Sequence, residues 1–174
     1  MLRKNCSAPS AQLTMTDIKS LLRLLAGNHV EFIVVGGVAG TAHGSARNTL
    51  DLDVAYRRSS ENVSRLVACL SPHAPYLRGA PPGLPFRFDA ETVLSGLNFT
   101  LQTDLGSLDL LGEITGGGGY EDLLPDSIEL QIYGVTCRCL KLRRLIEVKR
   151  AAGRPRDFDA VAELEALLEE KRNE

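Results

Sequence analysis

The feature that most constrains this chain is the stretch from Phe32 to Tyr56, in which two apolar runs flank a pair of glycines and a segment of small residues. The first run, residues 32–35, is bounded by glycine and predicts a short buried strand. Gly36 and Gly37 then allow the backbone to turn sharply and approach a ligand, because they have no Cβ. If residues 38–43 form a helix, its first N–H groups lie just after that turn, where phosphate oxygens bind favourably. The stretch therefore predicts a strand, a tight turn, a short helix and a second strand.

The second apolar run carries two acidic residues on one face. Side chains alternate along a strand, so Asp51 and Asp53 are expected to share a face with Thr49. Two neighbouring carboxylates repel each other unless a cation lies between them. Magnesium prefers oxygen ligands and leaves positions open for substrate phosphates. We therefore predict that these acids bind Mg²⁺, or Mn²⁺ in its place; the alternative is that they are solvated acids on an edge strand. The opposite face is expected to carry Leu50, Leu52 and Val54.

Length and composition bound the class of protein. With 174 residues, of which 44% are hydrophobic, the chain can bury the core of a single domain. We divide it into a flexible leader, residues 1–15, and one domain, residues 16–174, that ends in two helices. A formal charge of −2 is not that of a general nucleic-acid binder. The N-terminus lacks the apolar core of a signal peptide, and no apolar run reaches the length of a membrane span. We expect a cytoplasmic protein that does not bind a membrane.

The remaining elements follow from periodicity and turn residues. Thr16 is expected to cap the first helix. Two pairs of strands, within residues 99–111 and 128–139, are predicted on either side of short turns. Residues 71–88 are rich in proline and predict an irregular segment, either a functional lid or binding loop or a plain excursion. The four cysteines lack the spacing of a zinc site and predict buried or half-buried thiols.

Two motifs carry a resemblance to a known family. The string GGVAGTAHGSARNTLDLD has two glycines, thirteen further residues and then Asp51-Leu52-Asp53, and it resembles the signature of the DNA polymerase β superfamily of nucleotidyltransferases. The string LIEVKRAAGRPRDFDAVAEL, residues 145–164, is similar to a stretch of its small prokaryotic members, the AbiE toxin-type and MenT-type group. The resemblance implies an α+β fold, a minimal polymerase β-type nucleotidyltransferase core with a mixed β-sheet flanked by helices.

The resemblance also implies site residues. In the superfamily, the two acids of the DxD run and a third from a later strand hold two metal ions, and the context SLDLL matches Asp109 to the third position. Thr49 matches a place where a hydroxyl often lies near the incoming phosphates, and it is otherwise an ordinary strand residue. Arg47 either approaches the same phosphates or is solvated. The glycine pair, Gly36 and Gly37, completes the predicted nucleotide-binding set.

The order KRAAGRPRD near the C-terminus matches Lys149 and Asp157 to an active-site lysine and acid of the related toxins. A lysine supplies a point charge suited to a phosphate, and Arg150 is expected to bind the nucleotide beside it. Asp157 has an alternative role as a first-turn acid that stabilises the last helix. Further basic residues of this helix either bind a triphosphate or an RNA backbone or form a solvated face. These are Lys141, Arg143 and Arg144.

The predicted function is transfer of a nucleoside monophosphate from an NTP to an acceptor hydroxyl, with release of pyrophosphate. The resemblance suggests an RNA 3′ end, such as that of a tRNA, as acceptor and a toxin–antitoxin or phage-defence setting with a cognate antitoxin or toxin. A protein hydroxyl or a small molecule is also open as acceptor. Two alternatives are an antitoxin-type protein adenylyltransferase and a non-catalytic interaction module that keeps the fold. A dinucleotide-binding Rossmann domain is excluded, because GGVAG is not GxGxxG and repeated βαβ units are missing.

Overall fold

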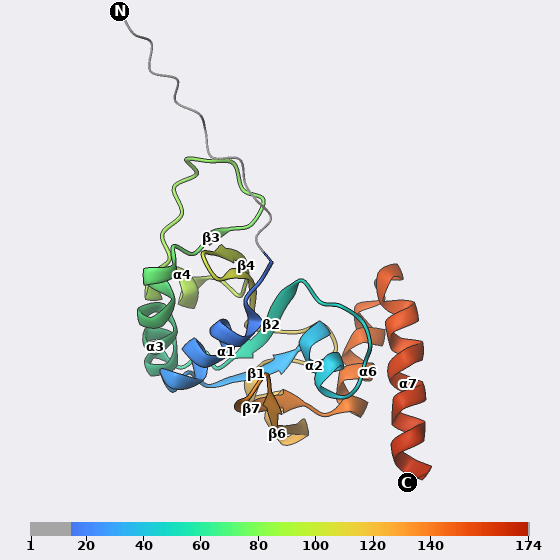
Figure 1. Cartoon of the computed structure of the whole chain (residues 1–174). Coiled ribbons are helices and arrows are strands. Elements are labelled where there is room, and N and C mark those ends of the chain that lie inside the picture. The colour runs from blue at the N-terminus through green and yellow to red at the C-terminus, as the bar shows by residue number, and fades with distance from the viewer. Residues whose placement is uncertain (1–14, 174) are drawn as a thin grey trace, which may run out of the picture.

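The computed structural model describes residues 15–173, and within this range seven strands form one mixed sheet at the centre of the molecule (Figure 1). The strand order is β3-β4-β5-β2-β1-β7-β6. Neighbours are antiparallel except for β2 beside β5 and β1 beside β7, which are parallel. The α+β class with a mixed sheet flanked by helices, predicted from the sequence, is confirmed. The strands are β1 (Phe32–Val35), β2 (Asp51–Tyr56), β3 (Tyr76–Leu77), β4 (Asn98–Thr103), β5 (Gly106–Leu111), β6 (Ser127–Ile132) and β7 (Val135–Leu140).

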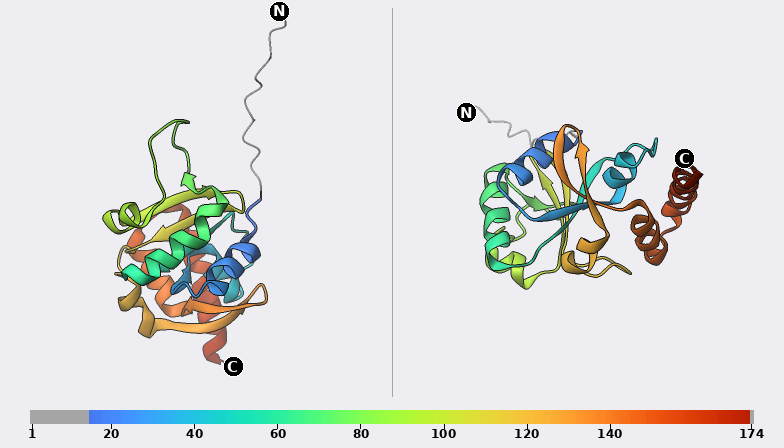
Figure 2. Two further views of the ribbon diagram at one scale, coloured as in Figure 1. Left: turned by 90° about the vertical axis from the view of Figure 1, so that its left-hand side faces the viewer. Right: turned by 90° about the horizontal axis from the view of Figure 1, so that it is seen from below.

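Helices cover both faces of this sheet. Figure 2 shows α1 and α3 on one side of the strands and α2, α6 and α7 on the other. Helix α7 packs on α6 rather than directly on the sheet, so the C-terminal pair forms an outer layer. The helices are α1 (Ile18–Gly27), α2 (Gly36–Ala42), α3 (Ser60–Leu70), α4 (Ala90–Ser95), α5 (Tyr120–Leu123), α6 (Leu142–Ala152) and α7 (Phe158–Asn173), with short 3₁₀ turns at Ser71–His73, Leu124–Asp126 and Pro155–Asp157.

The core lies between the sheet and its helical layers. All four residues of β1 are buried, and Leu52 and Val54 of β2 face the same interior. Helix α1 contributes the apolar stripe that its sequence predicts, with Leu21, Leu22 and Leu25 fully buried. Burying the apolar face of β2 leaves its other face, which carries the acids, directed toward α2 and α6. The thiols of Cys69, Cys137 and Cys139 are buried as predicted, whereas Cys6 and residues 1–14 of the predicted leader lie outside the described residues.

Two local predictions are wrong. The cap of α1 is Asp17 rather than Thr16, because the Asp17 carboxylate accepts hydrogen bonds from the backbone N–H and the hydroxyl of Ser20. The Thr16 hydroxyl instead donates to the carbonyl of Leu50 (2.6 Å) and accepts from the N–H of Ser107 (3.0 Å), which ties the segment before α1 to the residue preceding β2 and to β5. Leu50 precedes β2, and its side chain is 77% exposed rather than part of the buried face.

The hairpin agrees with its sequence pattern, and the proline-rich segment differs from its prediction in part. Strands β6 and β7 form the predicted hairpin around Tyr133 and Gly134, which both have positive φ, as a two-residue turn requires. The proline-rich segment, residues 71–88, is less irregular than predicted, because Tyr76 and Leu77 pair with β4 as an added edge strand. Among residues 15–173, none of the helices combines the length and apolar character needed to cross a lipid bilayer.

Candidate active site

The glycine pair sits directly against the acidic strand. Strand β1 is antiparallel to β2 with Val35 opposite Asp53, so the chain leaves β1 beside that acid. Gly36 begins α2 with a φ of +63°, and a Cβ there would overlap the Asp53 carboxylate. A Cβ on Gly37 would lie 2.5 Å from the hydroxyl oxygen of Thr49. Glycine is therefore required at both positions by the close approach of α2 to β2, as well as by the turn itself.

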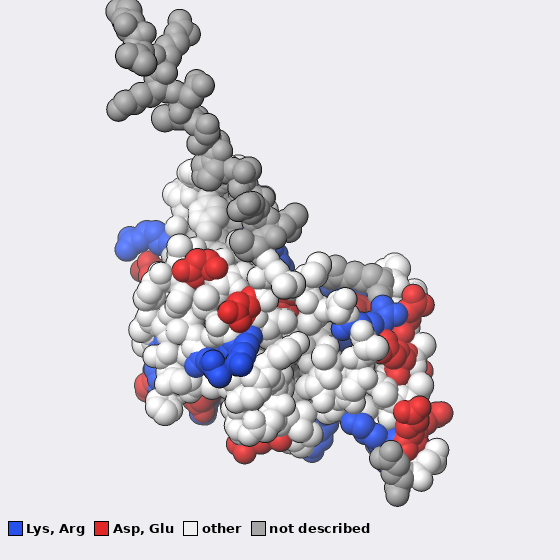
Figure 3. Space-filling model, viewed as in Figure 1, with Lys and Arg blue, Asp and Glu red and all other residues white. Residues whose placement is uncertain are grey.

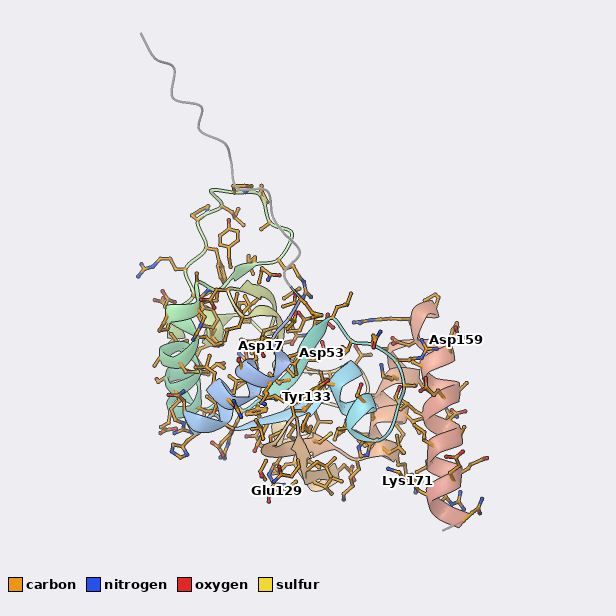
Figure 4. The ribbon with its side chains drawn as sticks, in the orientation of Figure 1. Asp17, Asp53, Glu129, Tyr133, Asp159 and Lys171 are labelled. Atoms are coloured by element: carbon orange, nitrogen blue, oxygen red, sulfur yellow. The ribbon has the colours of Figure 1, made fainter. Side chains whose placement is uncertain are left out.

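Three carboxylates converge beside this turn. Asp51 and Asp53 lie on one face of β2, as the strand period predicts, and β5 is parallel to β2 with Asp109 directly opposite Asp53. One carboxylate oxygen from each of the three residues lies within 4.8 Å of the others. Asp53 lies near the middle of the molecule in Figure 4, between the helical layers. A set of three carboxylate oxygens fits a hard divalent cation such as Mg²⁺.

The electrostatics of this group, which we call the carboxylate cluster, fit a bound cation. Burial, and to a smaller extent the charges of Asp51 and Asp109, together raise the pKa of Asp53 to about 7. The N–H of Gly37 and the ammonium of Lys149 oppose this rise without cancelling it. Burial also raises the pKa of Asp109. Without a cation, the fold therefore holds acids in a place where their ionised forms are unfavourable.

A pocket of about 450 Å³ opens next to the carboxylate cluster. The glycine pair and the three acids contribute polar lining, while α6 and α7 contribute apolar side chains such as Val148 and Leu164 together with the charged Lys149. This combination of an apolar wall with a few convergent polar groups is typical of small-molecule sites. Its polar lining includes Gly36, Gly37, Arg47, Thr49, Asp51, Asp53, Asp109, Lys149, Arg154 and Asp157, and its apolar lining includes Leu111, Ile114, Leu145 and Val148.

The pairing of strands in the sheet brings the C-terminal motif to this pocket. Strand β7 runs parallel to β1, so α6, which follows β7, packs beside α2. Lys149 lies in the last turn of α6, and Gly153 then reverses the chain in the left-handed conformation. The Lys149 ammonium lies 3.3 Å from the Asp157 carboxylate, and the two side chains are only 16% and 17% exposed. The two motifs, far apart in the sequence, thus line one pocket.

Two of the predicted nucleotide-binding arginines have other partners. Arg150 lies on the outer side of α6, is 61% exposed and forms an ion pair with Glu165 of α7, so the structure does not bring it to the pocket. Arg47 lines the pocket, but its Nε donates to Glu163 (3.0 Å). The other basic side chains of α6 also have partners within residues 15–173: Lys141 donates to the Pro125 carbonyl, Arg143 pairs with Glu147, and Arg144 pairs with Asp126 and Glu147. Figure 3 shows basic and acidic side chains interspersed on the face in view, with no large basic patch there.

Two residues near the site were missed from the sequence. The Arg78 guanidinium lies 2.7 Å from an Asp109 oxygen and 3.7 Å from an Asp51 oxygen. Glu163 of α7 accepts hydrogen bonds from the hydroxyl of Ser45 and the N–H of Ala46, both at 2.9 Å, and so fixes the loop that leads into β2. Nothing local marks either residue, because an arginine in a proline-rich segment and an acid on a terminal helix usually face solvent.

Comparisons with known proteins leave the family open. No protein-family model and no curated protein matches the chain. Among solved structures, the fold is similar to a crystal structure of a Thermotoga maritima protein described as a putative nucleotidyltransferase, with a TM-score of 0.49 and 13% sequence identity over 90% of this chain and 91% of that one. At that level the likeness does not assign an activity. The chemistry of the carboxylate cluster and its pocket must carry the functional conclusion.

Proposed function

We propose that this protein is a metal-dependent nucleotidyltransferase that moves a nucleoside monophosphate from an NTP to an acceptor hydroxyl and releases pyrophosphate. The observation that carries the proposal is the carboxylate cluster itself: two acids of β2 and one of β5 converge in a pocket that the glycine turn also lines. The resemblance of both sequence motifs to the DNA polymerase β superfamily supports the same reaction.

Some residues of the pocket would bind the cation, and others would contact the nucleotide. Asp51, Asp53 and Asp109 would hold Mg²⁺ or, in its place, Mn²⁺. When bound, such cations neutralise charge on the triphosphate and favour ionisation of the attacking hydroxyl. The absence of side chains at Gly36 and Gly37 lets the first turn of α2 lie directly against Asp53 and Thr49.

A positive charge on the opposite wall completes the site. The Lys149 ammonium faces the pocket, and its contact with Asp157 fixes its position while leaving further N–H donors for a phosphate. Thr49 also lines the pocket, and its hydroxyl donates to the carbonyl of Asp51 at 3.1 Å. Asp157 acts through Lys149 and is therefore a positioning residue in this proposal.

For the acceptor we propose an RNA 3′ end, such as that of a tRNA, in a toxin–antitoxin or phage-defence system with a cognate partner protein. The support is the resemblance of the motifs alone. The basic side chains of α6 other than Lys149 already contact acids or a carbonyl of the chain, so we do not assign an RNA backbone to them. A protein hydroxyl, as in the antitoxin-type adenylyltransferases, is the second outcome of the experiment below.

A non-catalytic interaction module is disfavoured by the energetics of the carboxylate cluster. Holding three carboxylates within 4.8 Å of one another, one of them with a pKa of about 7, costs stability at neutral pH. A chain that had no use for a cation there would gain stability at neutral pH by losing the carboxylate of Asp53. Destabilising arrangements of this kind are typical of functional sites.

The test is transfer of label from NTPs. The full chain is incubated with each α-labelled NTP, Mg²⁺ or Mn²⁺, and total RNA or total protein, and the labelled fraction is identified. We expect label in one fraction, and we expect Asp51→Asn to abolish it while Glu129→Gln, a change at an exposed residue of β6 far from the pocket, has no effect (Figure 4). Undiminished transfer by the Asp51 variant would refute the proposal, and so would the absence of label with all four NTPs.

A further inference from the structure

The proline-rich segment delivers an arginine to the carboxylate cluster. Strand β3 pairs with β4, and the N–H of Arg78 extends this pairing by donating to the carbonyl of Thr100 at 2.9 Å. Thr100 lies opposite Asp109 in the next pair of strands, so Arg78 and Asp109 are brought to the same face of the sheet. The backbone of the sheet edge therefore places Arg78 on the face that carries Asp109, and the contact with that carboxylate holds the guanidinium there.

Arg78 contacts the carboxylate cluster through charge. The Arg78 Nη2 donates to the Asp109 carboxylate at 2.7 Å and lies 3.7 Å from that of Asp51. Its side chain is 30% exposed, so it meets these two acids in a partly dry environment where charges act strongly. Arg78 thus neutralises part of the negative charge that a divalent cation would otherwise find. A cation that approaches the same oxygens is repelled by the guanidinium.

The proline-rich segment is also held together by contacts of Tyr76, the first residue of β3. The Tyr76 hydroxyl lies 3.0 Å from the Pro81 carbonyl oxygen and 3.2 Å from the Leu84 carbonyl oxygen, which share its single hydrogen, and the Tyr76 ring contacts the Phe86 ring edge to face at a centroid distance of 6.0 Å. Residues 76–86 are therefore one tied unit, with Tyr76 inside it and Arg78 at the carboxylate cluster. If the guanidinium moves away from the acids, we expect residues 76–86 to lose their contact with the carboxylate cluster.

We propose that Arg78 is an internal counter-cation of the carboxylate cluster, which a divalent cation must displace from Asp51 and Asp109, so that metal occupancy is coupled to the proline-rich segment. The inference rests on the proposed function in one respect, because it requires that the carboxylate cluster takes a divalent cation. It adds a residue that sets how tightly the cation is held, and it gives the proline-rich segment a role beyond that of a surface excursion.

The test is the affinity of the full chain for Mn²⁺, measured by calorimetry in the absence of nucleotide. Arg78→Met removes the charge and keeps the length of the side chain, and we expect it to bind Mn²⁺ about tenfold more tightly than the natural chain. Arg87→Met is the matched control, because Arg87 belongs to the same segment, is 88% exposed and pairs only with Asp89 among the described residues. Arg78→Lys keeps the charge and should stay within about twofold of the natural chain, which separates a charge effect from a packing effect.

Amide hydrogen exchange gives a second readout. In the natural chain, Mn²⁺ should speed exchange in residues 76–86, because the displaced guanidinium no longer anchors them, and in Arg78→Met it should have no such effect. Equal Mn²⁺ affinity of Arg78→Met and the natural chain would overturn this inference and leave the proposed function intact. Failure of the natural chain to bind Mn²⁺ at all would overturn both.

Discussion

Replacing Asp53 by asparagine should make the metal-free protein more stable while removing its activity. The pKa of this buried carboxyl is raised to about 7 from an ordinary value of 3.8. The folded protein therefore holds a proton on Asp53 in a pH range where the unfolded chain has lost it. As a result, the natural chain loses stability as pH rises from about 4 to about 7, and the loss is complete above that range.

The magnitude follows from this difference in pKa. At about 1.4 kcal/mol for each pH unit, it corresponds to at most about 4 kcal/mol of destabilisation above pH 7. Asparagine has nearly the same shape, cannot ionise, and keeps an oxygen that can accept the N–H of Gly37. We therefore expect Asp53→Asn to gain about 2–4 kcal/mol in the free energy of unfolding at pH 8, and less than half of that at pH 5. For a chain of this length, a gain of about 2 kcal/mol raises the melting temperature by roughly 4–8 °C.

The assay is thermal unfolding followed by circular dichroism, with EDTA present, at pH 8 and pH 5. Glu129→Gln serves as the control for loss of an acid, because Glu129 is exposed on β6. The stability of this variant should equal that of the natural chain at both pH values. Adding Mg²⁺ should narrow the gap at pH 8, because the natural chain gains a ligand that the variant holds less well. If Asp53→Asn is less stable than the natural chain at pH 8, or if its gain is the same at both pH values, the burial and the neighbouring charges that raise the pKa of Asp53 do not destabilise the folded protein.

Two further predictions concern the walls of the pocket. Gly37→Ala should lower transfer activity at least about tenfold and destabilise the protein by about 1–3 kcal/mol, because the added Cβ would lie 2.5 Å from the Thr49 hydroxyl oxygen. Transfer kinetics and thermal melting check these two effects. Gly27→Ala is the control, because a Cβ there meets nothing within 4 Å, and it should change neither the activity nor the stability. Lys149→Met should lower kcat/KM for the NTP by about 10²-fold or more, through the loss of a charge aimed at phosphate, whereas Arg143→Met, on the outer side of the same helix, should leave it unchanged. A Lys149 variant with normal kcat/KM would remove the C-terminal motif from the site.

The parts of the site that follow from neighbouring residues could be predicted from the sequence. The two-residue period of a strand places Asp51 and Asp53 on one face, and glycine at positions 36 and 37 marks the close approach of the backbone. The turn at Tyr133 and Gly134 follows in the same way. In each case the information lies within a few residues, where backbone sterics decide the outcome. The cap of α1 shows the limit of this reasoning, because Thr16 and Asp17 are both good caps and only the contacts of Thr16 with Leu50 and β5 decide between them.

What the sequence by itself determined about this protein is its inventory of elements, the shared face of the first two acids and the glycine turn beside them. What only the tertiary structure decided is which distant residues join them. Asp109 meets Asp53 because β5 lies parallel to β2, Lys149 reaches the pocket because β7 lies parallel to β1, and Arg78 reaches the acids across two strands. The order and direction of strands in a sheet depend on which buried faces pack together. The periodicity of residues within one strand does not specify which other strand pairs with it. For the same reason the pattern could not show that Arg150 turns outward to Glu165 while Lys149, one residue earlier, turns in.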